Sequence, residues 1–122
     1  EVRSRNLDKL NAQAAHMQKC LQDACDEMGA KLEIELKTNY VSFNVANDDP
    51  MVQRVFESCK RIGCEPMTAK GGGGSDANVM ALHGIKPIVL STGMTKVHTT
   101  GETLKIENLN KCAELVLDLM TH

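Results

Sequence analysis

Residues 71–98 read GGGGSDANVMALHGIKPIVLSTGMTKVH, and this stretch decides what kind of domain the chain can build. Four successive glycines let the backbone approach a ligand without side chains in the way. The polar run 75–78 then opens a short helix, whose first N–H groups point toward any bound anion. Residues 88–90 are apolar without alternation, which predicts a strand of a parallel sheet covered on both faces. The loop after it delivers His98 where open α/β sheets bind ligands.

His98 is the first candidate for a metal ligand, because a neutral imidazole suits zinc. Thr99, Thr100 and Glu102 follow it and could supply the partner that fixes the tautomer of the ring. The alternative is an ordinary loop histidine. The other three histidines are expected to be surface or terminal residues: His16, His83 and His122.

Composition excludes several classes of partner. The formal net charge of −2 gives no strong attraction to nucleic acid or anionic lipid. Only Tyr40, Phe43 and Phe56 are aromatic, too few for the stacking platforms of single-strand binders. No stretch approaches the roughly 20 apolar residues of a membrane helix, and no signal peptide opens the chain. We therefore expect a cytoplasmic protein with no nucleic-acid or membrane partner.

The five cysteines are odd in number and lack a C-x-x-C spacing. We interpret them as small buried hydrophobic residues in a reducing cytosol. They are Cys20, Cys25, Cys59, Cys64 and Cys112.

Apolar periodicity and capping residues predict four helices. The first begins after Asn6 and ends at Gly29. The second has Asp49 as its N-cap and Pro50 at its first position, and it ends at Gly63. The third and fourth cover residues 76–83 and residues from 106 onward.

Alternation and short apolar runs predict the strands. Residues 32–36 alternate apolar and charged side chains, as in a strand with one wet face. Residues 1–5, 38–46 and 67–70 are weaker candidates. Residues 1–37 thus form half of a split βαβ unit, and the α/β layer that follows has too few strands of its own. We infer that the chain is the carboxyl-terminal part of a larger enzyme.

Three segments in this order carry a resemblance to a known family. GGGSDAN at 72–78, GIKPIVLSTGM at 84–94 and HTTGE at 98–102 resemble the dinuclear zinc exopeptidase family of peptidase T and related tripeptide aminopeptidases. EVRSRN at 1–6, followed by a long helix, is similar to the third quarter of that family's lid domain. The similarity covers nearly the whole chain.

The resemblance implies an α/β fold in two parts. Residues 1–44 would be the second half of a ferredoxin-like α+β lid or dimerisation domain, and residues 45–122 the carboxyl-terminal segment of the α/β catalytic domain. It also implies two Zn²⁺ ions per complete active site, with His98 as the one ligand in this chain. The other ligands and the general base would lie upstream, so this chain would hold no catalytic residue.

The resemblance further implies substrate contacts along the glycine-rich turn. Backbone N–H groups of Gly73 and Gly74, with Ser75 and Asn78, would meet the main chain or carboxylate of a peptide. Asp76 is expected to cap the helix at Asn78 and Val79 or to orient a neighbouring residue. Peptidase T itself has an arginine where this chain has glycine before this turn. The substrate class therefore stays open to dipeptides or N-acyl amino acids.

Two functions of different classes follow. The first is the carboxyl-terminal part of a cytoplasmic zinc-dependent metallopeptidase, a hydrolase of short peptides that is inactive alone. Its expected partners are a short peptide substrate, a second copy in a homodimer and the missing amino-terminal part. The second is a non-catalytic dimerising module that binds an anion at the glycine-rich helix N-terminus. GGGGS at 71–75 also matches a flexible linker, but helix-starting residues would not follow a linker by design.

Overall fold

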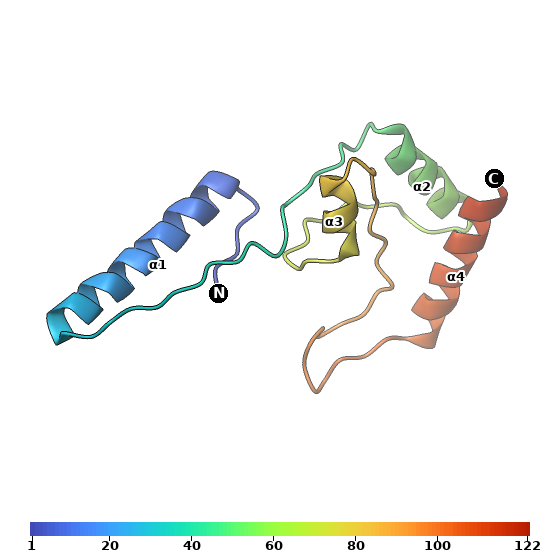
Figure 1. Cartoon of the computed structure of the whole chain (residues 1–122). Helices are drawn as coiled ribbons and strands as arrows, with labels where there is room; N and C mark the ends of the chain where they lie inside the picture. Colours follow the sequence, from blue (N-terminus) through green and yellow to red (C-terminus); the bar gives the residue numbers. More distant parts are fainter. The chain divides into compact units, whose positions relative to one another are not determined.

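The structure is a computed structural model that describes all 122 residues. It contains four α-helices joined by extended segments (Figure 1). In chain order these are α1 (Leu7–Met28), α2 (Pro50–Arg61), α3 (Asp76–Leu82) and α4 (Ile106–Thr121). All four predicted helices are confirmed. None of them combines the length and the apolar character that crossing a membrane requires.

The residues group into two compact units. Unit 1 holds Glu1–Asn44 and Gly71–Ile85, and unit 2 holds Val45–Lys70 and Lys86–His122. The glycine-rich segment and α3 therefore belong to unit 1, although they come late in the chain. The identification of the two parts as lid and catalytic domain stays a prediction.

The helix ends are set by the residues that the sequence indicates. The Asn6 side chain accepts a hydrogen bond from the Lys9 backbone N–H at 2.9 Å, and Gly29 ends α1 in the left-handed region with φ 65°. The Asp49 side chain caps α2 by accepting from the Met51 N–H at 3.0 Å. Lys86 also holds Asp49 at 2.6 Å, and its hydrogen bond is the main cause that lowers the pKa of this carboxyl.

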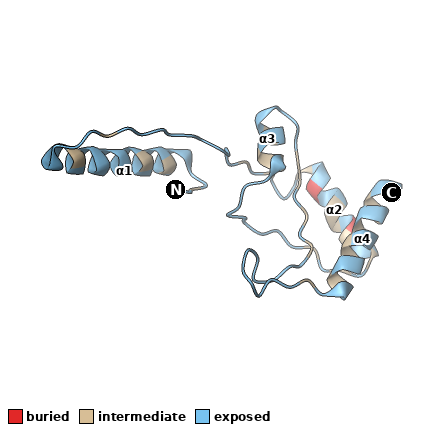
Figure 2. Ribbon diagram, turned by 60° about the horizontal axis from the view of Figure 1, so that its bottom comes forward, coloured by how far each residue is buried: buried red, intermediate tan, exposed pale blue.

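In unit 2, α2 packs against α4 (Figures 1 and 2). Arg61 on α2 donates from Nε to both carboxylate oxygens of Asp118 on α4, at 3.0 and 3.1 Å. This bond, with the Ser58 hydroxyl, lowers the pKa of Asp118 to about 2. Arg54 and Lys111 add bonds to backbone carbonyls across the pair.

The buried interior is very small. Val52 and Ser58, both on α2, are the buried residues, with 6% and 0% of their surface exposed (Figure 2). Twenty-two large apolar side chains are exposed, among them Met28, Met67 and Met120 at about four-fifths. The apolar faces that the periodicity predicts are therefore formed but left open to solvent.

The predicted strands are absent, so the α/β description is not confirmed. The chain contains no β-strand at residues 1–5, 32–36, 38–46, 67–70 or 88–90. A strand exists only through hydrogen bonds to a neighbour, and these extended segments have no neighbouring strand within the chain. The one ladder contact is an isolated antiparallel bridge between Thr95 and Thr103.

The interpretation of the cysteines as buried is wrong. Cys20 is exposed and the other four are partly exposed, and all five are free thiols. The reason is again the small interior, which leaves all five side chains at least partly open to solvent.

Candidate functional site

His98 lies in a loop of unit 2 that its own backbone closes. Thr95 and Thr103 face each other across the base, with N–H to O distances of 2.9 and 3.2 Å and 2.9 Å between their hydroxyl oxygens. Inside the loop, Thr99 donates to the Lys96 carbonyl from both its N–H and its hydroxyl, at 3.2 and 2.7 Å. The HTTGE sequence thus builds a compact turn whose ends are tied together.

The conformation of His98 is unusual for a non-glycine residue. Its φ is 63°, in the left-handed region, and Lys96 has φ 52°. The Glu102 carboxylate accepts the His98 backbone N–H at 2.8 Å, and the Glu102 N–H donates to the Thr99 carbonyl at 3.1 Å. A strained backbone of this kind persists only where its surroundings fix it, and such positions concentrate at functional sites.

The imidazole of His98 is exposed, and none of the loop's hydrogen bonds uses it. Glu102 was predicted as a partner for the ring, but in this structure it binds the main chain instead. The loop therefore orients the residue and leaves both ring nitrogens free for a ligand outside the chain.

A turn at Gly93 connects the start of this loop to α4. Gly93 has φ 77°, and its carbonyl accepts a hydrogen bond from the Asn108 side-chain amide at 3.2 Å. A Cβ on Gly93 would lie 2.6 Å from that amide nitrogen, closer than real Cβ atoms approach. Asn108 lies in the first turn of α4, so this contact fixes where the His98 loop starts. Its role could not be read from the sequence, because only the fold brings the two residues together.

The glycine-rich turn lies in unit 1, where crowding is confined to one glycine. A Cβ on Gly74 would overlap the ring of Tyr40, whereas Cβ atoms on Gly71, Gly72 and Gly73 would meet nothing within 4 Å. Gly74 is thus required by packing against Tyr40. The other three leave the backbone open to approach from outside.

The start of α3 is capped differently from the prediction. Ser75 is the N-cap, and its N–H donates to the Asn78 side-chain oxygen at 3.0 Å, as in a capping box. Asp76 is the first helical residue, so the expectation that it caps the helix is wrong. The physical reason is position: only the residue before the first helical turn has the extended backbone from which a side chain can reach back.

Asn78 is occupied at both ends of its amide. Its nitrogen donates to the Val41 carbonyl at 2.8 Å while its oxygen accepts from Ser75. The Asn78 N–H in turn bonds the Ser75 carbonyl at 3.0 Å. The side chain therefore joins α3 to the preceding extended segment, and the predicted contact to substrate stays a prediction for the residues Gly73, Gly74, Ser75, Asp76 and Asn78.

The chain does not by itself hold a metal centre. No group of three or more His, Cys, Asp or Glu side chains lies close enough to bind one ion. A zinc site in a protein has at least three protein ligands. The assignment of His98 as one metal ligand, with the remaining ligands outside this chain, therefore stays a prediction.

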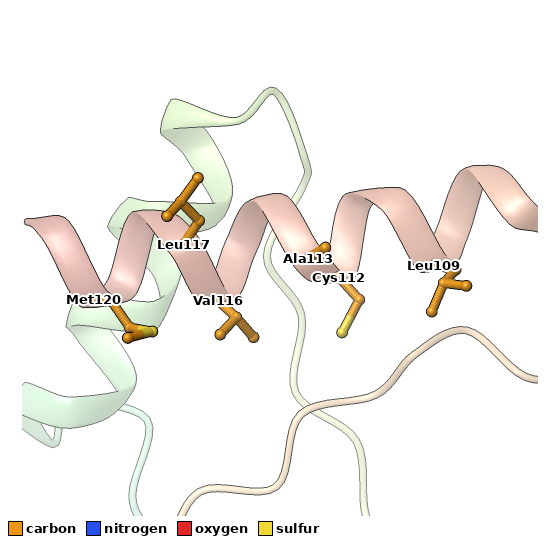
Figure 3. Close-up of a pocket in the computed structure, with 6 residues that line it drawn as sticks. All are labelled: Leu109, Cys112, Ala113, Val116, Leu117 and Met120. Carbon is orange, nitrogen blue, oxygen red and sulfur yellow. The ribbon is translucent and has the colours of Figure 1, made fainter.

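An open apolar hollow runs along α4. The one titratable group of its lining is the thiol of Cys112, and Figure 3 shows several of its side chains projecting from one side of the helix. The lining residues are Leu109, Cys112, Ala113, Val116, Leu117 and Met120. This surface is almost entirely apolar and can pack against apolar groups.

Comparison with known proteins decides the family. The model of peptidase family M20/M25/M40 matches residues 6–122, nearly the whole chain. This chain belongs to peptidase family M20/M25/M40. The predicted resemblance to peptidase T is therefore confirmed.

Solved members of the M20/M25/M40 family share the fold of this chain. Aminopeptidase PepT from Bacillus cereus is 37% identical, with a TM-score of 0.75 over 93% of this chain and 31% of its own. A tripeptidase from Staphylococcus aureus is 30% identical, with a TM-score of 0.83 over 95% of this chain and 31% of its own. The uncharacterized protein YqjE of Bacillus subtilis is 35% identical over 98% of this chain and 32% of its own length. The chain thus spans about a third of the length of these relatives.

Proposed function

We propose that this chain is the carboxyl-terminal part of a metal-dependent exopeptidase that hydrolyses short peptides, and that His98 is its one metal ligand. The family assignment supports peptidase chemistry, and the solved relatives are described as an aminopeptidase and a tripeptidase. In this proposal the protein works in the cytoplasm with two Zn²⁺ ions per active site. It holds no catalytic residue within residues 1–122.

The His98 loop is the observation that carries the proposal. The loop that connects residue 94 to residue 105 holds His98 at φ 63°, in the left-handed region. Here the Thr95–Thr103 bridge and the Glu102 carboxylate over-determine that backbone, and the ring is left free. The left-handed conformation costs roughly 1–3 kcal/mol, and residues held in it cluster at active sites and ligand-binding sites.

The metal would polarise the scissile carbonyl and lower the pKa of a bound water, which is the chemistry zinc supplies to hydrolases. The residues of this chain have supporting parts in that reaction. Glu102 keeps the His98 backbone in its turn, and the open backbone at Gly71–Gly73 is free to approach a bound peptide. The apolar face of α4 is proposed to pack against the amino-terminal part of the same enzyme.

Two alternatives differ in how the structure bears on them. An N-acyl amino acid deacylase of the same family would use the same residues on a different amide. The anion-binding module is disfavoured, because the N–H groups of Ser75 and Asn78 are already bonded and Asp76 adds a negative charge to the first turn. The deacylase is therefore the alternative worth testing.

The first test is the length of the native protein. Immunoblotting of cell extract with an antibody raised against residues 106–122 should detect a polypeptide about three times as long as this chain, as the relatives are. A band no longer than 122 residues would contradict the proposal and favour a module.

The second test concerns His98 in that native protein. His98→Ala should lose bound metal and turnover of di- and tripeptides together, whereas His83→Ala, which changes an exposed residue after α3, should keep both. Retention of metal and activity in His98→Ala would refute the ligand assignment. Hydrolysis of N-acyl amino acids in place of peptides would keep the ligand and replace the substrate class.

A further inference from the structure

Two cysteines occupy the two positions that the end of α2 brings together. The Cys64 N–H donates to the Cys59 carbonyl at 2.8 Å. Between them, Gly63 has φ 75°, and its N–H donates to the Lys60 carbonyl at 3.1 Å. This pair of bonds around a left-handed glycine is the Schellman motif, in which the side chains of the two outer residues are often in contact. Here both outer residues carry thiols, and the proposed peptidase chemistry uses neither of them.

The hydrogen bond between the two cysteines sets an upper limit on their separation. Standard bond lengths and the 2.8 Å distance from N to O place the two Cα atoms at most about 6.7 Å apart. A disulfide joins residues whose Cα atoms are about 4.4–6.8 Å apart, so the backbone already meets this requirement. Burial raises the pKa of the Cys59 thiol, and the charge of Cys64 is the second cause, as expected of thiols that lie close together.

The end of α1 has the same motif with only one thiol. The Ala30 N–H donates to the Cys25 carbonyl at 2.8 Å, and the Gly29 N–H donates to the Asp26 carbonyl at 3.3 Å. Gly29 has φ 65°, so the two helix ends share their backbone geometry. In α1 the motif places a cysteine opposite an alanine. It therefore provides an internal control for the cysteine pair of α2.

A lysine of α4 lies beside the cysteine pair. The Lys111 Nζ donates to the Ile62 carbonyl at 3.1 Å and to the Glu114 carboxylate at 2.6 Å. The hydrogen bond to Glu114 is the main cause that raises the pKa of Lys111, and the charge of Cys64 adds to it. The ammonium group thus attracts a thiolate at Cys64, whereas burial favours the neutral thiol at Cys59. The thiolate is the reactive form of cysteine, so the two thiols have different parts in an oxidation.

We propose that Cys59 and Cys64 form a redox-sensitive dithiol that hydrogen peroxide oxidises to a disulfide. The Cys64 thiolate attacks one peroxide oxygen, the O–O bond breaks, and hydroxide leaves and takes up the proton that Cys64 released. The Cys59 sulfur then attacks the resulting sulfenic acid, the S–O bond breaks, and water leaves with the Cys59 proton. Two molecules of a cellular thiol such as glutathione reduce the disulfide and pair with each other, as for the transient disulfides of cytosolic proteins.

Trypsin makes this disulfide directly detectable, because it cleaves after Lys60 and Arg61, between the two cysteines. The native protein that contains this chain is treated with hydrogen peroxide, which is then removed. The remaining thiols are blocked with iodoacetamide in denaturant, and the tryptic digest is analysed by mass spectrometry. We expect the peptides of Cys59 and Cys64 to appear as one linked species after peroxide treatment, and dithiothreitol to separate them.

Matched variants identify the partners and test the geometry. Cys64→Ser should lose the linked species, and Cys112→Ser, which removes another half-buried thiol of unit 2, should keep it. Ala30→Cys supplies the second thiol to the α1 motif and should gain a peroxide-dependent disulfide to Cys25. This gain does not depend on any residue near α2, so it tests the backbone geometry by itself.

Two results would overturn the proposal. One is peroxide treatment that leaves Cys59 and Cys64 unmodified or oxidises them separately, and the other is linkage of either residue to Cys112 instead. The disulfide is independent of the proposed peptidase centre, so it should form equally in His98→Ala. Retained turnover in His98→Ala would contradict the peptidase proposal and leave the dithiol proposal intact.

Discussion

The isolated 122-residue chain should not unfold cooperatively, because it leaves too much apolar surface exposed. The excess exposed area gives the size of the missing stabilisation. Two separate globular units, each of half the mass, would together expose about 7,800 Å². The chain exposes 9940 Å². The difference is about 2,100 Å². Apolar atoms usually contribute about 55–60% of the exposed surface of a folded protein, so roughly 1,200 Å² of this difference is apolar. At about 25 cal/mol per Å² this is a deficit of about 30 kcal/mol.

This deficit exceeds the whole stability of a typical domain, about 5–15 kcal/mol. The comparison uses two separate units, so it does not depend on how the units are arranged. The exposed faces of α1 and α4 supply much of the apolar surface, with Met28 and Met120 81% and 79% exposed. The chain alone therefore lacks the burial that would offset its conformational entropy.

Differential scanning calorimetry tests this reasoning. A self-sufficient domain of 122 residues would absorb about 85 kcal/mol near 60 °C, at about 0.7 kcal/mol per residue. We expect a broad transition with less than half of that enthalpy. A single sharp transition near 85 kcal/mol, independent of protein concentration, would refute the reasoning and show that the chain buries its apolar faces by itself.

Two further predictions concern unit 2 in the native protein. Gly93→Ala should destabilise it by about 2–4 kcal/mol, because the left-handed backbone costs about 1–2 kcal/mol and the Asn108 hydrogen bond is displaced as well. Gly63→Ala is the matched control, with φ 75° and open space around it, and should cost only the backbone part in urea titrations; equal losses would contradict the Asn108 contact. Asp118 has its pKa lowered to about 2 by Arg61, so its contribution to stability is complete above the ordinary carboxyl value of 3.8 and is lost as the pH falls through about 2. Carboxyl NMR titration should show this low pKa and its return upward in Arg61→Gln; an unchanged pKa in that variant would argue against the ion pair.

Helix positions could be predicted from the sequence because their signals are local. Asn6 and Gly29 bound α1, and Asp49 and Pro50 start α2, through contacts with residues only a few positions away. Strands depend on partners far along the chain or outside it, so residues 88–90 carry the right side chains and still form no ladder here. The strand predictions are not confirmed, because these segments have no neighbouring strand in the chain, although their residue pattern is that of a strand.

In the candidate site too, local features could be predicted from the sequence and long-range contacts could not. His98 could be singled out from the HTTGE spacing, but the left-handed turn that Glu102 supports could not, because a carboxylate near a histidine in sequence can bind either the ring or the main chain. Tyr40 and Asn108 were missed, since each contacts its glycine across a gap of 15 residues or more. Only the contact shows why Gly74 and Gly93 must be glycine.

The four-glycine run at residues 71–74 and the isolated Gly93 have different roles, and the longer run is not the more constrained of the two. Four glycines in a row draw attention to residues 71–74, yet only Gly74 is crowded, and the isolated Gly93 has both a positive φ and a close neighbour. A position that only glycine can occupy constrains the structure most where the segment after it must be placed accurately. Gly93 stands two residues before the bridge that closes the His98 loop. The position of the proposed metal ligand His98 is therefore constrained from Gly93 onward. The glycines at 71–73, in contrast, leave the backbone of unit 1 accessible from outside.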